Sequence, residues 1–326
     1  MSPVATSRAF LRASWALLAF TLLVVAWGGL VRASRSGDGC GANWPTCNGE
    51  VFPTATALKT RIEFTHRVTS GAILGPLVLA WVGWALARFP KGSRVRRAAW
   101  ASLGLLVVEA LVGAGLVRRG LVGTDESVAR VVVMGLHLCT TFALLAALLL
   151  TGLWADGTAR PRLSGQRPVS TLVLASLAAL LVVGVTGAIA ALGDTLFPPR
   201  SLQEGLLQDA SPTAHFLLRL RILHPVLAAA GASLLLATAA VAAFLRPGRA
   251  VRRAAAVVAL AVVAQLVVGL VNLALLAPLP LQLLHLLLAD VVWLSVVALA
   301  AQALAADAPR LVVPGPGVQP VEAAPR

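Results

Sequence analysis

Arg61-Ile62-Glu63-Phe64-Thr65-His66-Arg67 lies at the start of an apolar run that continues through residues 68–87. The run is long enough to cross a membrane as a helix, so this stretch decides the class of fold. Glu63 and His66 are three residues apart and share one face of that helix. Ionisable side chains are costly at membrane depth and usually face the interior of a helix bundle. The stretch therefore indicates a functional site.

The composition of the whole chain is that of a polytopic membrane protein. Of its 326 residues, 58% are hydrophobic and 12% are charged, and the mean hydropathy is +0.86. Soluble proteins of this size carry far more charge. Apolar runs of spanning length cover residues 13–31, 64–87, 98–117, 131–154, 170–192, 222–245, 254–277 and 281–306. We therefore predict an all-α membrane protein with eight transmembrane helices.

The basic residues indicate how the chain is oriented in the membrane. The net charge is +14, and its placement in short loops favours membrane orientation over nucleic-acid binding. Four basic clusters mark one side: Arg8 and Arg12; Arg88, Lys91, Arg94, Arg96 and Arg97; Arg160, Arg162 and Arg167; and Arg246, Arg249, Arg252 and Arg253. Because cytoplasmic loops collect Lys and Arg, we expect both termini in the cytoplasm.

This orientation places four histidines near the outer face of the membrane: His66, His137, His224 and His285. The first apolar run is too long for a cleaved signal peptide, and residues 1–12 are too few for a transit peptide. We therefore expect a retained first helix and the plasma membrane of a prokaryote.

The second half of the chain repeats the first. His66 aligns with His224 and His137 with His285, and the offset stays near 150 to 160 residues. Such an offset indicates an internal duplication. Each half has four spans, so both halves enter the membrane in the same direction. We expect two tandem four-helix bundles related by a pseudo-twofold axis along the membrane normal.

The duplication suggests a division of the chain. Residues 1–155 form the N-terminal four-helix half, residues 156–168 a cytoplasmic linker, and residues 169–306 the C-terminal four-helix half. The segment 307–326 is rich in Pro, Gly and Ala, and we expect it to be a disordered cytoplasmic tail.

The halves differ at ionisable positions. Glu63 corresponds to Arg221, and Glu109 of the third span corresponds to Gln265. A carboxylate beside the histidine therefore exists only in the first half. Two interpretations of Glu109 stay open at this point, namely part of a proton path and a protonated packing residue.

Two cysteines in the loop after the first span are candidates for a disulfide. Cys40 and Cys47 are seven residues apart on the side that we assign to the oxidising exterior. A bond between them would be either a structural staple or a redox-active pair. Cys139 lies inside the fourth span without an evident partner, and we interpret it as a packing residue.

Four histidines at one depth predict two haem sites. Two histidines on facing helices of a four-helix unit can ligate one haem iron from both sides. A zinc or copper site fits less well, because no cysteine or paired carboxylate joins the histidines at ligand spacing. Guanidinium groups near the outer ends of the spans suit the haem propionates. These belong to Arg61, Arg67, Arg130, Arg219 and Arg221.

Four motifs together resemble the haem A synthase family. They are Gly28-Gly29-Leu30-Val31-Arg32, the loop from Cys40 to Cys47 with Trp44-Pro45, Glu63-Phe64-Thr65-His66-Arg67, and Gly193-Asp194-Thr195-Leu196-Phe197-Pro198. The resemblance covers all eight expected helices. Some members of the family carry a second cysteine pair between the fifth and sixth helices, and residues 194–221 contain none.

The resemblance implies a haem-dependent oxidoreductase that oxidises the C8 methyl of haem O to a formyl group through hydroxylated intermediates. It implies that His66 and His137 hold the substrate haem O and that Glu63 assists the oxidation. His224 and His285 would ligate a resident haem b that relays electrons. The implied partners are membrane lipid, a haem O synthase, the aa3-type oxidase assembly pathway and an electron partner of unknown identity. Homo-oligomerisation stays open.

Two other functions fit parts of the pattern. A di-haem b electron carrier linked to quinol needs the same four ligands but no carboxylate beside one haem only. A proton-coupled transporter would use Glu63 and Glu109, and membrane transporters often contain repeats. Transporters of that kind have helices interrupted at mid-membrane, for which Pro76 is the nearest candidate. We interpret His215, a loop histidine without a counterpart, as a surface residue.

Overall fold

The computed structural model describes residues 8–54 and 57–306, and these residues are mainly helical. The first half contains α1 (Arg8–Ala33), α2 (Leu58–Arg67), the π-helix η1 (Val68–Ile73), α3 (Leu74–Arg88), α4 (Arg94–Arg118) and α5 (Val128–Ala155). The second half contains α6 (Val169–Leu196), α7 (Leu202–Ala210), α8 (Phe216–Arg221), α9 (Leu223–Leu245), α10 (Arg249–Ala274) and α11 (Leu279–Ala303). Within the described ranges, strand pairing is confined to two isolated bridges.

Eight helical segments of this part of the chain are long and apolar enough to cross a membrane. Two of them are composite, because α2, η1 and α3 form one span and α8 and α9 form another. This confirms the predicted all-α, multi-pass fold. Most spans begin or end beyond the predicted bounds. The seventh instead stops at Ala274, because Leu276 and Ala277 take positive φ angles of 60° and 54° and turn the chain.

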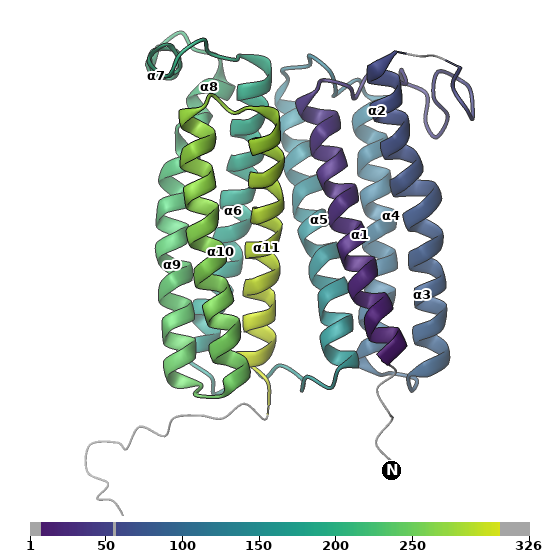
Figure 1. Ribbon diagram of the computed structural model, residues 1–326, viewed down its shortest axis with the longest axis vertical. Coiled ribbons are helices and arrows are strands. Elements are labelled where there is room, and N and C mark those ends of the chain that lie inside the picture. Colours follow the sequence, from purple (N-terminus) through teal and green to yellow (C-terminus); the bar gives the residue numbers. More distant parts are fainter. Residues whose placement is uncertain (1–7, 55–56, 307–326) are drawn as a thin grey trace, which may run out of the picture.

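The spanning helices lie in two groups (Figure 1). Helices α1, α3, α4 and α5 form one group, and α6, α9, α10 and α11 form the other. Residues 156–168 connect α5 to α6 at the end where α1 begins and α11 ends. The division into halves and the pseudo-twofold axis remain predictions, and the predicted tail 307–326 lies outside the described residues.

Aromatic and polar contacts join the two groups. Phe142 of α5 stacks on Trp293 of α11 with ring centroids 4.8 Å apart, and the Trp293 indole N–H donates to the Phe142 carbonyl at 2.7 Å. Arg32 at the end of α1 donates to the Ala191 carbonyl at 2.7 Å and to Gln282 Oε1 at 3.1 Å. These bonds reach α6 and α11, so one guanidinium fastens three helices at the end that carries the histidines.

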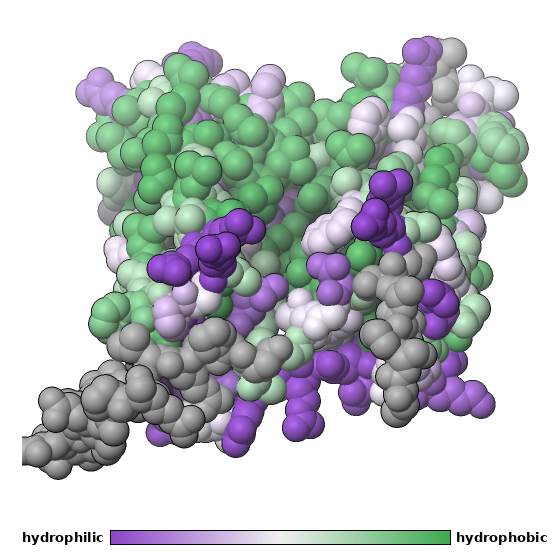
Figure 2. Space-filling model, turned by 60° about the horizontal axis from the view of Figure 1, so that its bottom comes forward, coloured by the Kyte–Doolittle hydropathy of each residue, from purple (hydrophilic) through white to green (hydrophobic). Residues whose placement is uncertain are grey.

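The surface has the polarity of a membrane protein. Figure 2 shows hydrophobic residues over much of the helical surface and hydrophilic residues gathered toward the lower end. Exposed leucines and valines occur along every spanning segment, as expected of side chains that face lipid. The connections 89–93, 156–168 and 246–248 lie at the end where the predicted basic clusters occur. The assignment of that end to the cytoplasm remains a prediction.

The second span changes its helical geometry directly after His66. Residues Val68–Ile73 form a π-helix, in which the Leu74 N–H donates to the Thr69 carbonyl. Pro76 follows three residues later and cannot donate a backbone hydrogen bond. The His66 carbonyl accepts instead from the hydroxyls of Ser70 at 2.6 Å and Thr69 at 3.1 Å. Side-chain hydroxyls thus satisfy the backbone where the regular ladder is interrupted.

Candidate functional site

The structure places the four predicted histidines on four different spans, toward the same end of the molecule. His66 lies in the last turn of α2, His137 in α5, His224 at the start of α9 and His285 in α11. His66 and His137 belong to the first group of helices, and His224 and His285 belong to the second. The assignment of these two pairs to two haem sites stays a prediction.

Each histidine ring lies against a glycine on a neighbouring helix. A methyl group on Gly28 of α1 would lie 3.2 Å from His66 Cε1, and one on Gly187 of α6 would lie 2.9 Å from His224 Cε1. A methyl group on Gly269 of α10 would lie 2.9 Å from His285 Cε1. One on Gly113 of α4 would lie 4.0 Å from His137 Cε1. The glycines recur at equivalent places in both halves. The rings of His66, His224 and His285 occupy space that a side chain on the glycine would need, whereas His137 is at ordinary contact distance from Gly113.

The rings of the second histidine pair are separated by a distance at which both could bind one metal. The rings of His224 and His285 have centroids 6.3 Å apart and planes inclined at 85°. Two imidazoles bound to one metal from opposite sides, through bonds of about 2 Å, place their centroids about 6 Å apart. His285 Nδ1 is buried and has no hydrogen-bond partner among the described residues. The residues present thus fit an iron held between two histidines.

The first pair offers similar ligands. His66 Nδ1 is also buried and, within the described ranges, accepts and donates no hydrogen bond. A buried imidazole nitrogen without a partner is costly unless a ligand occupies it. No three His, Cys, Asp or Glu side chains of the described chain come together as a metal cluster. The histidine pairs are therefore the features that fit a metal carried within a larger group such as haem.

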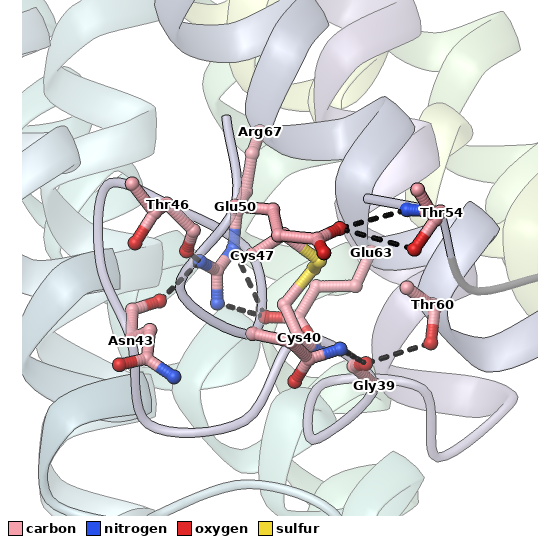
Figure 3. Close-up of a disulfide and its surroundings, with 11 residues drawn as sticks. Gly39, Cys40, Asn43, Thr46, Cys47, Glu50, Thr54, Thr60, Glu63 and Arg67 are labelled. Atoms are coloured by element: carbon pink, nitrogen blue, oxygen red, sulfur yellow. Dashed lines mark hydrogen bonds and ion pairs between the residues drawn. A yellow bond between two sulfur atoms is a disulfide. The ribbon is translucent and has the colours of Figure 1, made fainter. Parts of the chain in front are cut away.

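Glu63 lies beneath the disulfide loop and is 3% exposed (Figure 3). Its Oε2 accepts from the Cys40 backbone N–H at 2.8 Å, and its Oε1 accepts from Arg67 Nε at 3.1 Å and Nη2 at 2.5 Å. Arg67 also donates through Nη1 to the carbonyls of Asn43 and Thr46. One arginine therefore holds both the carboxylate and the loop that covers it.

The predicted disulfide joins Cys40 and Cys47, and both residues are buried. The loop packs onto the start of α2 because Gly39 has no side chain. A methyl group there would lie 2.5 Å from the Lys59 carbonyl carbon, and Thr60 Oγ1 donates to the Gly39 carbonyl at 2.7 Å. This contact brings the Cys40 N–H over Glu63. Whether the disulfide is a staple or redox-active stays open.

The five arginines predicted to bind propionates have different surroundings. Arg67 holds Glu63, and Arg130 donates to the carbonyls of Gly123 and Asp125 at 3.0 and 2.6 Å. Arg221 contacts Asp194 and Asp209, as described below. Arg61 and Arg219 are exposed.

The charge beside the histidine is inverted in the second half. Arg221, the counterpart of Glu63, donates to Asp194 at 2.8 Å and lies 2.5 Å from Asp209 Oδ1. In the first half a buried carboxylate is held by a cation, whereas in the second half a cation is held by two carboxylates. The inequality between the halves at Glu63 and Arg221 therefore extends to the surroundings of these two residues.

Glu109 contacts one of the predicted ligands. Its Oε2 lies 2.6 Å from His137 Nδ1, while Gln265 Nε2 lies 3.3 Å from His285 Nε2. The loop histidine His215 accepts from the Leu217 N–H at the start of α8 and lies 3.7 Å from Glu126.

Sequence reasoning missed three features of this region. Arg32 was quoted only as part of a motif, and its contacts with α6 and α11 depend on tertiary packing. The pairing of Gly28 and Gly187 with histidines was not recognised, although their spacing of 159 residues matches the duplication. Asp290 is 1% exposed, and neither carboxylate oxygen has a hydrogen-bond partner in the described part of the chain. Its signal was a lone carboxylate within the last apolar run.

Comparison with known proteins identifies relatives for most of the chain. A family model, COX15-CtaA, described as "Cytochrome oxidase assembly protein", matches residues 12–297. A Thermus thermophilus protein named Protoheme IX farnesyltransferase is 48% identical over 243 residues, which cover 74% of this chain and 40% of that protein.

Shorter matches reach proteins named Heme A synthase. The protein from Symbiobacterium thermophilum is 37% identical over 158 residues, 47% of this chain and 48% of the relative. That from Exiguobacterium sibiricum is 36% identical over 103 residues, 31% of this chain and 34% of the relative. The matches span less than half the length of each of these relatives. Because the family model covers most of its length, the chain belongs to the COX15-CtaA family of cytochrome oxidase assembly proteins, the heme A synthase family.

Proposed function

We propose that this protein is a haem A synthase that oxidises the C8 methyl of haem O to a formyl group through hydroxylated intermediates. One observation carries the proposal. Two pairs of histidines, each ring next to a glycine of a neighbouring helix, lie toward one end of the bundle, and the buried Glu63 lies near only one pair. A pure electron carrier has no use for that inequality. Family membership supports haem A formation in general.

The two halves take different haems in this proposal. His66 and His137 hold the substrate haem O in the first half, where Glu63 lies three residues before His66. His224 and His285 hold a resident haem b, and their ring separation of 6.3 Å supports this role. When bound, haem b supplies one-electron transfer. Exposed Arg61 and Arg219 are the freest of the five arginines to pair with propionates, since Arg67, Arg130 and Arg221 also hold protein groups.

Glu63 acts on the substrate as a charge-stabilising or acid-base group. Oxidation of a methyl group develops positive charge on the carbon and releases protons. A carboxylate held in place by Arg67 and the Cys40 N–H is preorganised to stabilise that charge without reorientation. The Cys40–Cys47 loop covers Glu63 and limits the access of water, which strengthens the electrostatic effect.

The partners and location follow from the same proposal. The Thermus relative carries the name of a farnesyltransferase and is much longer than its matched region. We propose that a haem O synthase delivers the substrate and that the product enters aa3-type oxidase assembly. The electron partner and any homo-oligomer stay undefined. We place the protein in a prokaryotic plasma membrane with both termini in the cytoplasm.

Extraction of haem from the purified protein tests the function. We expect haem b together with haem O, hydroxylated haem or haem A when the detergent-solubilised protein is extracted with acidified solvent and analysed by chromatography and mass spectrometry. Haem b alone, at two per chain, would instead support the di-haem carrier. A protein free of haem would support the transporter.

The glycines next to the histidine rings lead to a second prediction, on haem binding. Gly269→Ala places a methyl group 2.9 Å from the His285 ring, so we expect the ring to move and the haem signal of the second half to fall. Overpacking of this kind costs about 1–3 kcal/mol. The visible spectrum and haem content per chain measure the effect. Gly104→Ala is the matched control, since Gly104 is also helical and a methyl group there meets nothing within 4 Å. Equal haem content in the two variants would contradict the steric argument.

A further inference from the structure

Glu109 lies within an apolar span and contacts a histidine of the neighbouring helix. It lies in α4 and approaches His137 of α5, with Oε2 2.6 Å from Nδ1. The Glu109 side chain is 11% exposed and that of His137 is 35% exposed. The other carboxylate oxygen, Oε1, has no hydrogen-bond partner among the described residues. The carboxylate is therefore close to Nδ1 of His137, without the angles of a hydrogen bond in this structure, and leaves the other nitrogen, Nε2, for a ligand.

The second half offers a built-in comparison. Gln265 of α10 is the counterpart of Glu109, and its Nε2 lies 3.3 Å from the counterpart histidine, His285 of α11, at Nε2 rather than at Nδ1. Both contacts join equivalent helices, and α4 packs on α5 as α10 packs on α11. The duplication has therefore kept a polar residue beside each histidine while changing its charge. The first histidine has an anionic neighbour, and the second has a neutral one.

A carboxylate on the far nitrogen of a metal-bound histidine has a known physical effect. It fixes the tautomer and the ring orientation and raises the basicity of the ligand. Negative charge close to a metal in a low-dielectric environment also favours the more positively charged, oxidised metal. A neutral amide beside a histidine ligand carries no such charge, and Gln265 leaves His285 Nδ1 without a partner among the described residues.

We propose that Glu109 is a positioning residue that lowers the reduction potential of the haem held by His137, relative to that of the haem held by His285. This rests on the proposed ligands and deepens the proposed function, because it makes the first-half haem the more readily oxidised of the two. It also replaces the two earlier interpretations of Glu109. No chain of further polar partners extends from Oε1 in the described residues, as a proton path requires, and a packing role needs no contact with Nδ1.

Two reciprocal substitutions test the inference. Glu109→Gln gives the first half the amide of the second, and Gln265→Glu gives the second half the carboxylate of the first. Both are close to isosteric. Spectroelectrochemical titration of the full-length holoprotein in detergent gives the potential of each haem, and a titration in the His285→Ala background assigns them. We expect Glu109→Gln to raise the potential of the first-half haem by about 59 mV, which corresponds to a tenfold change in relative affinity for oxidised and reduced iron.

The reciprocal variant has the opposite expected sign. Gln265→Glu places a carboxylate beside the His285 ring, at Nε2, and should lower the potential of the second-half haem while leaving the first unchanged. Unchanged potentials in Glu109→Gln with full haem occupancy would overturn the inference. If that variant loses its haem, Gln265→Glu decides, and an unshifted potential in Gln265→Glu overturns the inference as well.

A chain that binds two haems with these shifts but forms no haem A would refute the proposed function and leave the role of Glu109 standing. A chain that binds no haem overturns both.

Discussion

Glu63→Gln is expected to reduce haem A formation by about 10²- to 10⁴-fold while haem binding and the fold are retained. Glutamine keeps the shape of the side chain and an oxygen that can accept from the Cys40 N–H, so the loop stays in place. It removes the negative charge that is proposed to act on the substrate. Alanine is a poorer choice, because it would also leave the Cys40 N–H without its acceptor and remove the side chain under the loop.

The measurement is the ratio of haem A to haem O in membranes that express the variant, together with haem content per purified chain. Glu50→Gln is the matched control, because Glu50 lies in the same loop region but is exposed and accepts only from Thr54 in the contacts described. Normal haem A levels in Glu63→Gln would remove the assigned role. Loss of haem from the purified variant would indicate that Glu63 acts on the fold of the site instead.

His285→Ala is expected to remove the haem of the second half and to abolish haem A formation. The His224 and His285 rings are placed as two ligands of one metal, and an alanine leaves one axial position empty. Haem content should fall by one per chain, and the b-type absorbance should fall with it. His224→Ala should give the same result.

His215→Ala serves as the control for these two variants, since His215 caps α8 and contacts Glu126 outside the histidine pairs. We expect it to keep both haems. An unchanged b-type spectrum in His285→Ala would rule out the assignment of that ligand. A loss of all haem in every histidine variant, His215→Ala included, would indicate unfolding rather than ligand removal.

The fold and the candidate ligands could be predicted because their signals are local or periodic. Long apolar runs give the spans, and the repeat at 150 to 160 residues identifies His66, His137, His224 and His285 as equivalent pairs. The Cys40–Cys47 disulfide was predictable from spacing and loop position. The exact helix ends were not, because they depend on turns such as the one at Leu276 and Ala277.

The contacts within the site depend on tertiary packing and lay beyond the sequence. Nothing in the order of residues says that the Cys40 N–H meets Glu63, or that Glu109 reaches Nδ1 of His137. The two interpretations of Glu109 could not be separated until the distance between α4 and α5 side chains was known. Asp290 differs from these contacts, because a lone carboxylate within the last apolar run is a signal that the sequence itself carries.

The π-helix after His66 changes the register of the second span. A π turn holds about one more residue than an α turn, so the residues after η1 are shifted by one position relative to an uninterrupted α-helix. One residue turns an α-helix by about 100°. The face of α3 that packs Val78 and Trp81 into the core is therefore set independently of the face that presents His66. In the second half the break at Ile222 lies before His224, so His224 and the buried residues of α9 belong to one uninterrupted helix. The two halves therefore differ in how the histidine is joined to the packed face of its span.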